Sequence, residues 1–446
     1  MARRSGTDYR LALARLKELM VDPSRFSTDE EVLSGYLEAG TAYRNLIACL
    51  CPRDAEDIRR IAEVARGQGL SVYTPIPWGL NPPRAGVVVD FRCMADIVEI
   101  DTRNLFACVE PGVTWEQLMP ELTALGVRVA LPASAKSRYV LESALEREVV
   151  LSASRFSNKQ LSTFHAVLAD GREYRSGSDA LPGSKAHWRE DGGPNISRVF
   201  TGSRNSFGIP VRGYVFLFPQ PESRKVVVRG FANRAQACRM AQRAARGEIG
   251  TEVMVLNKAK ASEILGEDPG FASWSAVFGL EGSPRLVAYH EKRLDQIATE
   301  LKLKQKVATR AATVSMARAL EGPWYAPPLS IGFYTEFARV DEMSAIVESR
   351  LKEKGRLAQM LIPVKRGASV YAQLDLRTRA ASDGAASTIK DLLPALSDAG
   401  AFFPNPTGPL ATHIFSRQPT YFELLKNLKR FMDPDDMLNT RQVVEV

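Results

Sequence analysis

The stretch CPRDAEDIRRIAEVARGQGLSVYTPIPWGLN, residues 51–81, decides the fold class, because it joins a strong helix signal to a strand and a loop. Asp54 is a suitable N-cap, apolar residues recur at helical spacing from Ile58 to Ala65, and Gly69 ends the pattern. The stretch therefore predicts an amphipathic helix over 54–68, followed by a strand and a loop rich in proline.

Outward from this helix, short β-rich segments alternate with turn signals, at 71–76, 86–91, 96–100 and 106–112. Thr114 and Gln117 have the spacing of a capping box, which predicts a second helix that ends at Gly126. We expect an N-terminal helical segment at 1–45 and a first domain of the α+β class at 46–222, completed by strands at 127–132, 163–171 and 212–222.

The pattern changes after Pro219 and Pro221. A strand from Lys225 is followed by a helix at 233–246, a strand at 273–282 and a helix from Leu286, which is a β-α-β-α layout. We expect an α/β, ferredoxin-like second domain over 223–405 and a helical return to the first domain over 406–446.

The composition excludes several classes of protein. The net charge is +8, but basic residues are interspersed with acidic ones, so we do not expect a nucleic-acid-binding protein. The densest basic stretches, 234–246 and 302–310, predict either solvated helix faces or a docking surface for an acidic partner subunit. Five cysteines without paired spacing indicate no metal site.

No long apolar run is present, and Arg and Lys interrupt the apolar positions of the first 20 residues. We therefore expect no membrane span and no signal peptide, and a cytoplasmic location, with a periplasmic location through a partner left open.

Several segments resemble one family of flavoenzymes. The opening stretch, continued by GVVVDFRCMADIVEIDTRNLFACVEPGVTWEQL at 86–118, is similar to the flavin-binding domain of the vanillyl-alcohol oxidase and p-cresol methylhydroxylase family. The resemblance continues through LESALEREVVLSAS, AVLADGREYRSGSDALPGS, ISRVFTGSRNSFGIPVRGYVFLFPQPE and KRFMDPDDMLN. It implies a two-subdomain, PCMH-type FAD-binding domain, a cap over the isoalloxazine ring, and hydride transfer from a phenolic substrate to flavin.

The first loop that the resemblance assigns to FAD lies at 74–86. Candidate cofactor contacts there are Trp78, Gly79, Leu80 and Asn81. Prolines at 75, 77, 82 and 83 remove amide donors that a pyrophosphate cradle needs, so a rigid loop without a ligand is the alternative.

The second flavin segment departs further from the family. Glu142, Glu148 and Val150 stand where the resemblance places glycines, while Ala144 and Arg147 keep the register and are candidate cofactor contacts. A carboxylate beside a diphosphate would be repelled, unless the backbone turns Glu148 to solvent or Arg147 neutralises it.

The resemblance implies a pocket in which Tyr and Arg stabilise a phenolate. Weak candidates for catalytic residues are Tyr325, Tyr334, Arg366, Tyr371, His413 and Arg417, and packing in the core or cap is the alternative for the aromatic ones. The first 164 residues contain no histidine, which excludes a histidyl flavin link from the first loop.

Two functions follow from the resemblance. The first is a non-catalytic or FAD-poor subunit that assembles with an FAD-bearing paralogue and, through it, with an electron-transfer partner such as a cytochrome. The second is a competent FAD-dependent oxidoreductase that acts on a phenolic or aryl-alcohol substrate.

Overall fold

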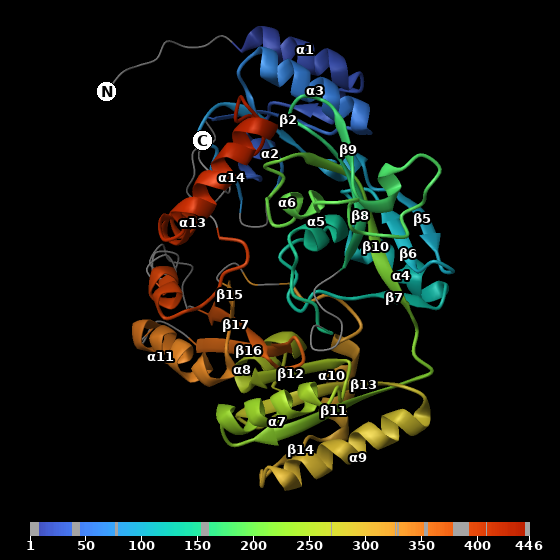
Figure 1. Cartoon of the computed structure of the whole chain (residues 1–446), viewed down its shortest axis with the longest axis vertical. Coiled ribbons are helices and arrows are strands. Elements are labelled where there is room, and N and C mark those ends of the chain that lie inside the picture. Colours follow the sequence, from blue (N-terminus) through green and yellow to red (C-terminus); the bar gives the residue numbers. More distant parts are fainter. Residues whose placement is uncertain are drawn as a thin grey trace.

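The computed structural model describes residues 9–37, 45–75, 79–152, 160–268, 270–325, 327, 330–351, 356–377, 392–406 and 408–441. It has two lobes (Figure 1): a blue and green one with the red C-terminal helices beside it, and a yellow and orange one. Within the described ranges, no helix is both long enough and apolar enough to cross a bilayer.

The first sheet belongs to the upper lobe. Its strand order is β1 (Phe26–Ser27), β2 (Leu46–Leu50), β4 (Gly86–Val89) and β3 (Ser71–Tyr73). β2, β4 and β3 are parallel because α3 (Ala55–Gly67) carries the chain from β2 back to β3. Asp54 caps α3 as predicted. The apolar face of α3 packs with α1 (Arg10–Met20) in one hydrophobic core. The short helix α2 (Glu30–Ser34) follows β1.

The second sheet also belongs to the upper lobe. Its strand order is β5 (Ile97–Asp101), β6 (Phe106–Val109), β10 (Ile209–Pro219), β8 (Leu161–Val167) and β9 (Glu173–Arg175), with β7 (Val127–Val129) also on β10. The predicted capping box of Thr114 and Gln117 starts α4 (Trp115–Ala124). Residues of α4, α5 (Val140–Leu145) and α6 (Ser197–Phe200) pack together against this sheet in one hydrophobic core.

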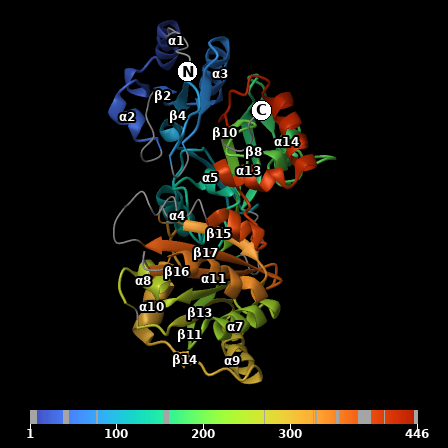
Figure 2. The same ribbon diagram turned by 90° about the vertical axis from the view of Figure 1, so that its left-hand side faces the viewer.

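The third sheet forms the lower lobe. It is antiparallel, in the order β14 (Lys306–Val307), β11 (Ser223–Phe231), β13 (Trp274–Gly282), β12 (Glu252–Asn257), β16 (Arg356–Val364), β17 (Ser369–Arg377) and β15 (Ser330–Thr335). Its first four strands have the order of a ferredoxin-like unit, with the additional helix α8 (Lys258–Leu265) between β12 and β13. β15 and β17 lie on the side of this lobe that faces the upper lobe (Figure 2).

Alternating side chains of the third sheet form two cores. Val227 packs on one face with α7 (Arg234–Arg246), α9 (Pro284–Glu300) and α11 (Val340–Leu351). Val226 and Val228 pack on the other face with α8 (Lys258–Leu265) and α10 (Arg310–Ala319). The second core also contains Val149, Val150 and Leu151 of the upper lobe, so it joins the two lobes.

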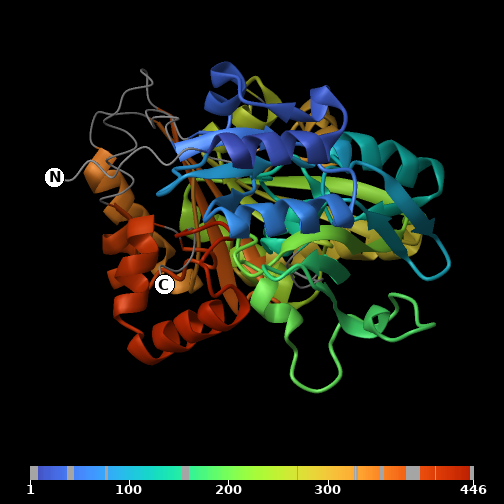
Figure 3. The same ribbon diagram turned by 90° about the horizontal axis from the view of Figure 1, so that it is seen from above.

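The C-terminal segment returns to the upper lobe through α13 (Gly408–Ser416) and α14 (Pro419–Met432), which lie along one side of the molecule (Figure 3). Lys429 is buried and donates to the carbonyl of Ser206 at 2.8 Å, to that of Leu438 at 2.9 Å and to the Asp433 carboxylate at 2.6 Å. Asp433 also accepts the amides of the turn after α14. This network fixes the last described turn beside β3.

Candidate functional site

The first candidate cofactor loop is held by the protein's own hydrogen bonds. Gly79 has a φ of 86°, a left-handed conformation that suits glycine. The amide of Leu80, fully buried, donates to the carbonyl of Tyr36 at 2.7 Å, and Asn81 is exposed. Trp78 lies outside the described residues. The Leu80 amide is therefore already used within the protein.

The start of this loop is tied to two distant segments. The amide of Thr74 donates to Asn439 Oδ1 at 2.9 Å, and the Thr74 hydroxyl accepts from Asn439 Nδ2 at 2.9 Å. Asn205 Nδ2 donates to the same hydroxyl at 3.0 Å. The hydrogen bonds from Asn205 and Asn439 to Thr74 therefore hold the start of the first loop in place.

The second candidate segment turns two carboxylates into the protein. Glu142 accepts from the Ser137 hydroxyl at 2.6 Å. Glu148 accepts from the backbone amide of Lys136 at 3.0 Å and from the Ser143 hydroxyl. Glu148 is thus held by the interior rather than turned to bulk solvent. Val150, 1% exposed, packs in the core between the lobes.

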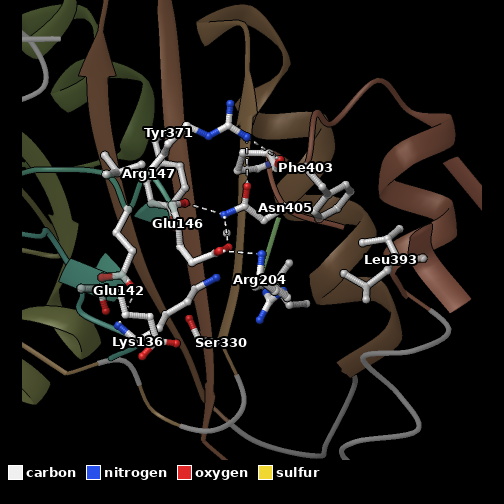
Figure 4. A pocket seen from close by; sticks show the side chains of 17 residues that line it. Lys136, Glu142, Glu146, Arg147, Arg204, Ser330, Tyr371, Leu393, Phe403 and Asn405 are labelled. Carbon is white, nitrogen blue, oxygen red and sulfur yellow. Dashed lines mark hydrogen bonds between the residues drawn. The ribbon is translucent and has the colours of Figure 1, made fainter. Parts of the chain in front are cut away.

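These carboxylates line a cavity of about 220 Å³ between the two lobes (Figure 4). One wall comes from the loop before α5, from α5 and the turn after it, and from the loop before β10. The other comes from β15, β17 and the segment around α13. The polar side chains of the lining include those of Lys136, Glu142, Glu148, Arg204, Tyr371 and Asn405.

Tyr371 reaches the cavity from β17. Its side chain is 7% exposed, and its ring centroid lies 5.3 Å from that of Tyr334. A Cβ on Gly332 would lie 2.1 Å from the Tyr371 hydroxyl, so glycine at this position leaves the room that the hydroxyl occupies. Among the described residues, this hydroxyl has no hydrogen-bond partner.

A polar seam closes one end of the cavity. Asn405 Nδ2 donates to the Glu146 carbonyl at 2.5 Å, and Arg147 donates to Asn405 Oδ1 at 3.2 Å. The amide of Arg204 donates to the Glu146 carboxylate at 2.9 Å. Gly202, with a φ of 76°, is needed here because a Cβ would lie 2.4 Å from an Arg147 guanidinium nitrogen. The seam holds the α5 turn against the segment before α13.

Burial dominates the electrostatics of the cavity. It raises the pKa of Glu142 from 4.5 to about 8, so this carboxyl is mainly protonated at neutral pH. Burial also raises the pKa of Glu148 and lowers that of Lys136. The cavity therefore presents a neutral carboxyl group, that of Glu142, and the Tyr371 hydroxyl to a small molecule.

The other catalytic candidates lie elsewhere. Tyr325 donates to Glu116 at 2.6 Å, and Arg366 pairs with Glu248 at 2.8 Å. His413 and Arg417 both pair with Asp398. The structure thus brings Arg147 and Tyr371 to the cavity, with Tyr334 behind Tyr371.

Four cavity residues are not indicated by the sequence alone: Lys136, Glu146, Arg204 and Asn405. Glu146 and Arg204 lie inside segments that carry the resemblance, so those segments were the available signal for these two. No motif marks Lys136 or Asn405.

Comparisons with known proteins agree on the fold. The FAD binding domain family model matches residues 47–177. The chain is 28% identical over 198 residues to the glycolate oxidase subunit GlcD of Bacillus subtilis (strain 168), covering 42% of this chain and 40% of that one. It is 29% identical over 186 residues to the 4-cresol dehydrogenase [hydroxylating] flavoprotein subunit of Pseudomonas putida, covering 39% and 35%. The matched region thus spans well under half the length of these two relatives.

Two solved structures match almost the whole chain. p-Cresol methylhydroxylase with substrate bound superposes with a TM-score of 0.82 at 16% identity, covering 99% of this chain and 98% of that one. 4-Ethylphenol oxidase from Gulosibacter chungangensis superposes with a TM-score of 0.84 at 16% identity, with the same coverage. Residues 47–177 thus match the FAD binding domain family, and the chain has the PCMH-type FAD-binding fold of these two enzymes.

Proposed function

We propose that this chain is a subunit of a flavin-dependent oxidoreductase of the 4-cresol dehydrogenase and vanillyl-alcohol oxidase type, and that it does not itself hold FAD. The observation that carries the proposal is the position of Glu142 and Glu148. Both stand where the resemblance places glycines, and both side chains line the cavity between the lobes.

The Glu148 carboxyl group and the size of the cavity both count against a bound flavin. A carboxylate about 4 Å from a phosphate charge costs about 4 kcal/mol at an effective dielectric near 20. The cavity measures about 220 Å³, below the range of about 300–1,000 Å³ that is common for ligand pockets. The Leu80 amide, a candidate donor to the pyrophosphate, is already bonded to Tyr36.

The proposed partner is an FAD-bearing paralogue, which would supply the redox chemistry. One relative of this chain is named a flavoprotein subunit, which supports an assembly of several subunits. An electron-transfer protein such as a cytochrome would then contact the paralogue or the basic face of α7, where Arg239, Arg243 and Arg246 lie.

The test is the flavin content of the purified chain, expressed alone and together with a paralogue. We expect no flavin in the chain alone and one flavin per paralogue in a co-purified complex. One flavin per copy of the chain alone would overturn the proposal.

A competent FAD-dependent oxidoreductase is the second candidate, because the FAD binding domain model matches residues 47–177 and Gly79 keeps a left-handed turn in the first loop. In that case the protein would bleach its flavin when mixed anaerobically with a phenol or aryl alcohol. A bound flavin that such substrates do not reduce would reject this candidate.

A further inference from the structure

The outer edge of β15 carries backbone groups that the third sheet does not use. On one side, β15 pairs with β17 in unbroken register from Ser330 to Thr335. On the other side, the Tyr334 amide donates to the Phe402 carbonyl at 2.8 Å, and the Phe402 amide donates to the Tyr334 carbonyl at 2.9 Å. Successive residues of a strand direct their amide and carbonyl to opposite sides, so those of Gly332 point to the same side as those of Tyr334. Gly332 therefore directs one donor and one acceptor away from β17.

A proline ends the pairing at this edge. In the register set by Tyr334 and Phe402, the residue opposite Gly332 is Pro404, which has no amide hydrogen to donate. The Pro404 carbonyl accepts instead from the Arg147 guanidinium at 3.4 Å. Within the described part of the chain, no loop residue or side chain bonds the outward amide or carbonyl of Gly332. Such groups on a strand edge can pair with the donor and acceptor of another molecule.

This edge opens into the cavity between the lobes. Ser330, Ile331, Gly332 and Pro404 all line it. Ile331 belongs to the core on one face of the third sheet and Tyr371 to the core on the other, so the cavity reaches both faces, as a space beyond a sheet edge does. Its volume of about 220 Å³ limits a ligand to a small molecule.

The Tyr371 hydroxyl lies beside the same backbone groups. A Cβ on Gly332 would collide with this hydroxyl, which shows that the two are in direct contact. The Tyr371 side chain is 7% exposed, and its hydroxyl has no hydrogen-bond partner among the described residues. Buried polar groups in folded proteins are almost always hydrogen-bonded. A carbonyl oxygen placed at the Gly332 amide would give the hydroxyl an acceptor.

The charged groups of the cavity favour a ligand without charge. The carboxylates of Glu146 and Glu148 line the cavity and repel an anion, in agreement with the proposed function. Lys136 and Arg147 line it as well and repel a cation. The apolar part of the lining, which suits a hydrocarbon body, consists of Ile331, Leu393, Phe403 and Leu410.

We propose that this cavity binds a small, uncharged carboxamide, such as a lactam, through the free edge of β15. The ligand N–H donates to the Gly332 carbonyl, and the ligand carbonyl accepts from the Gly332 amide and the Tyr371 hydroxyl. A lactam suits this edge because its N–H and carbonyl lie side by side, as the two groups of Gly332 do. The inference rests on the proposed function, because a flavin would compete for the same space.

The test uses the full chain, after its flavin content has been measured. Isoindolinone, an aromatic lactam, is titrated by calorimetry at pH 7 beside phthalide, in which an oxygen replaces the lactam N–H, and beside benzoate. We expect isoindolinone to bind at least about tenfold more tightly than either comparator, because phthalide sets an oxygen against the Gly332 carbonyl. Flavin-free protein that does not prefer the lactam would overturn this inference alone, whereas one flavin per chain would overturn the proposed function as well.

The Gly332 amide gives a direct readout of the strand edge. In protein that carries isotope-labelled glycine, saturating isoindolinone should shift the amide resonance of Gly332, assigned with the Gly332→Ala variant, and slow its hydrogen exchange. Gly192, with open space around it, is the matched control and should not change. A lactam that binds and leaves the Gly332 resonance unchanged would refute the proposal.

A pair of tyrosine variants tests the hydroxyl. Tyr371→Phe removes only this group and should weaken lactam binding by about tenfold. Tyr325→Phe is the matched control, because its hydroxyl bonds Glu116 outside the cavity, and it should bind as the unmodified chain does. Equal affinity of Tyr371→Phe and the unmodified chain, with both thermally stable, would contradict the role given to the hydroxyl.

Discussion

Replacement of Glu148 by Gln and by Gly should restore affinity for FAD in stages. Glu148 accepts from the Lys136 amide at 3.0 Å and stands at a position where the resemblance places glycine. One carboxylate about 4 Å from a phosphate charge costs about 4 kcal/mol at an effective dielectric near 20. Removal of that charge alone would therefore tighten FAD binding by up to about a thousandfold.

Gln keeps the bulk of the side chain and removes its charge, whereas Gly removes both. We expect Glu148→Gln to gain part of the affinity and Glu148→Gly, combined with Glu142→Gly, to gain more. The assay is the quenching of FAD fluorescence on titration with apoprotein. Glu121→Gln, on the exposed side of α4, removes an equal charge far from the cavity and serves as the control.

Two outcomes would refute this reasoning. If the unmodified chain binds FAD as tightly as Glu148→Gln does, the carboxylate does not repel the cofactor. If the glycine variants remain folded and gain no more affinity than Glu121→Gln, charge and bulk at the second segment do not exclude flavin.

Three further predictions concern the fold that carries the site. Burial raises the pKa of Glu142 from 4.5 to about 8, so between these pH values the native state binds more protons than the unfolded chain. The stability of the protein should therefore fall as the pH rises through this range. In thermal melts the melting temperature of Glu142→Gln should not show this fall, and the same pH dependence in both proteins would contradict the prediction. Lys429→Met leaves Asp433 buried without its cation and should lower the free energy of unfolding by about 3–5 kcal/mol in urea titrations; a loss below about 1 kcal/mol would show that Asp433 needs only its amide donors. Gly202→Ala should destabilise the chain by about 1–3 kcal/mol because of its left-handed backbone and the close guanidinium, whereas Gly192→Ala, with open space around it, should change little; equal melting temperatures would contradict this.

The local elements could be predicted because their signals are local. The Asp54 cap and the capping box of Thr114 and Gln117 are each complete within four residues, and both helices begin where these signals predict. The strand expected at 71–76 ends at Tyr73, because the next residue, Thr74, bonds to Asn439 rather than to a neighbouring strand. Such a contact, between residues far apart in the sequence, has no local signal.

The cavity residues also fall into two groups, those that a local segment of the sequence indicates and those that only the folded structure brings together. The resemblance marked Glu142, Glu148 and Arg147, because they stand in a segment with a known relation to flavin. It could not show that Lys136 supplies the amide that holds Glu148, or that Gly332 leaves room for the Tyr371 hydroxyl. Both facts depend on how two lobes and a loop meet in space.

The most direct test of the account is the ratio of released flavin to protein after denaturation of the purified, unmodified chain, measured by absorbance and fluorescence. We expect the chain expressed alone to release no flavin, even after incubation with excess FAD and removal of the unbound cofactor. One flavin released per chain would contradict it.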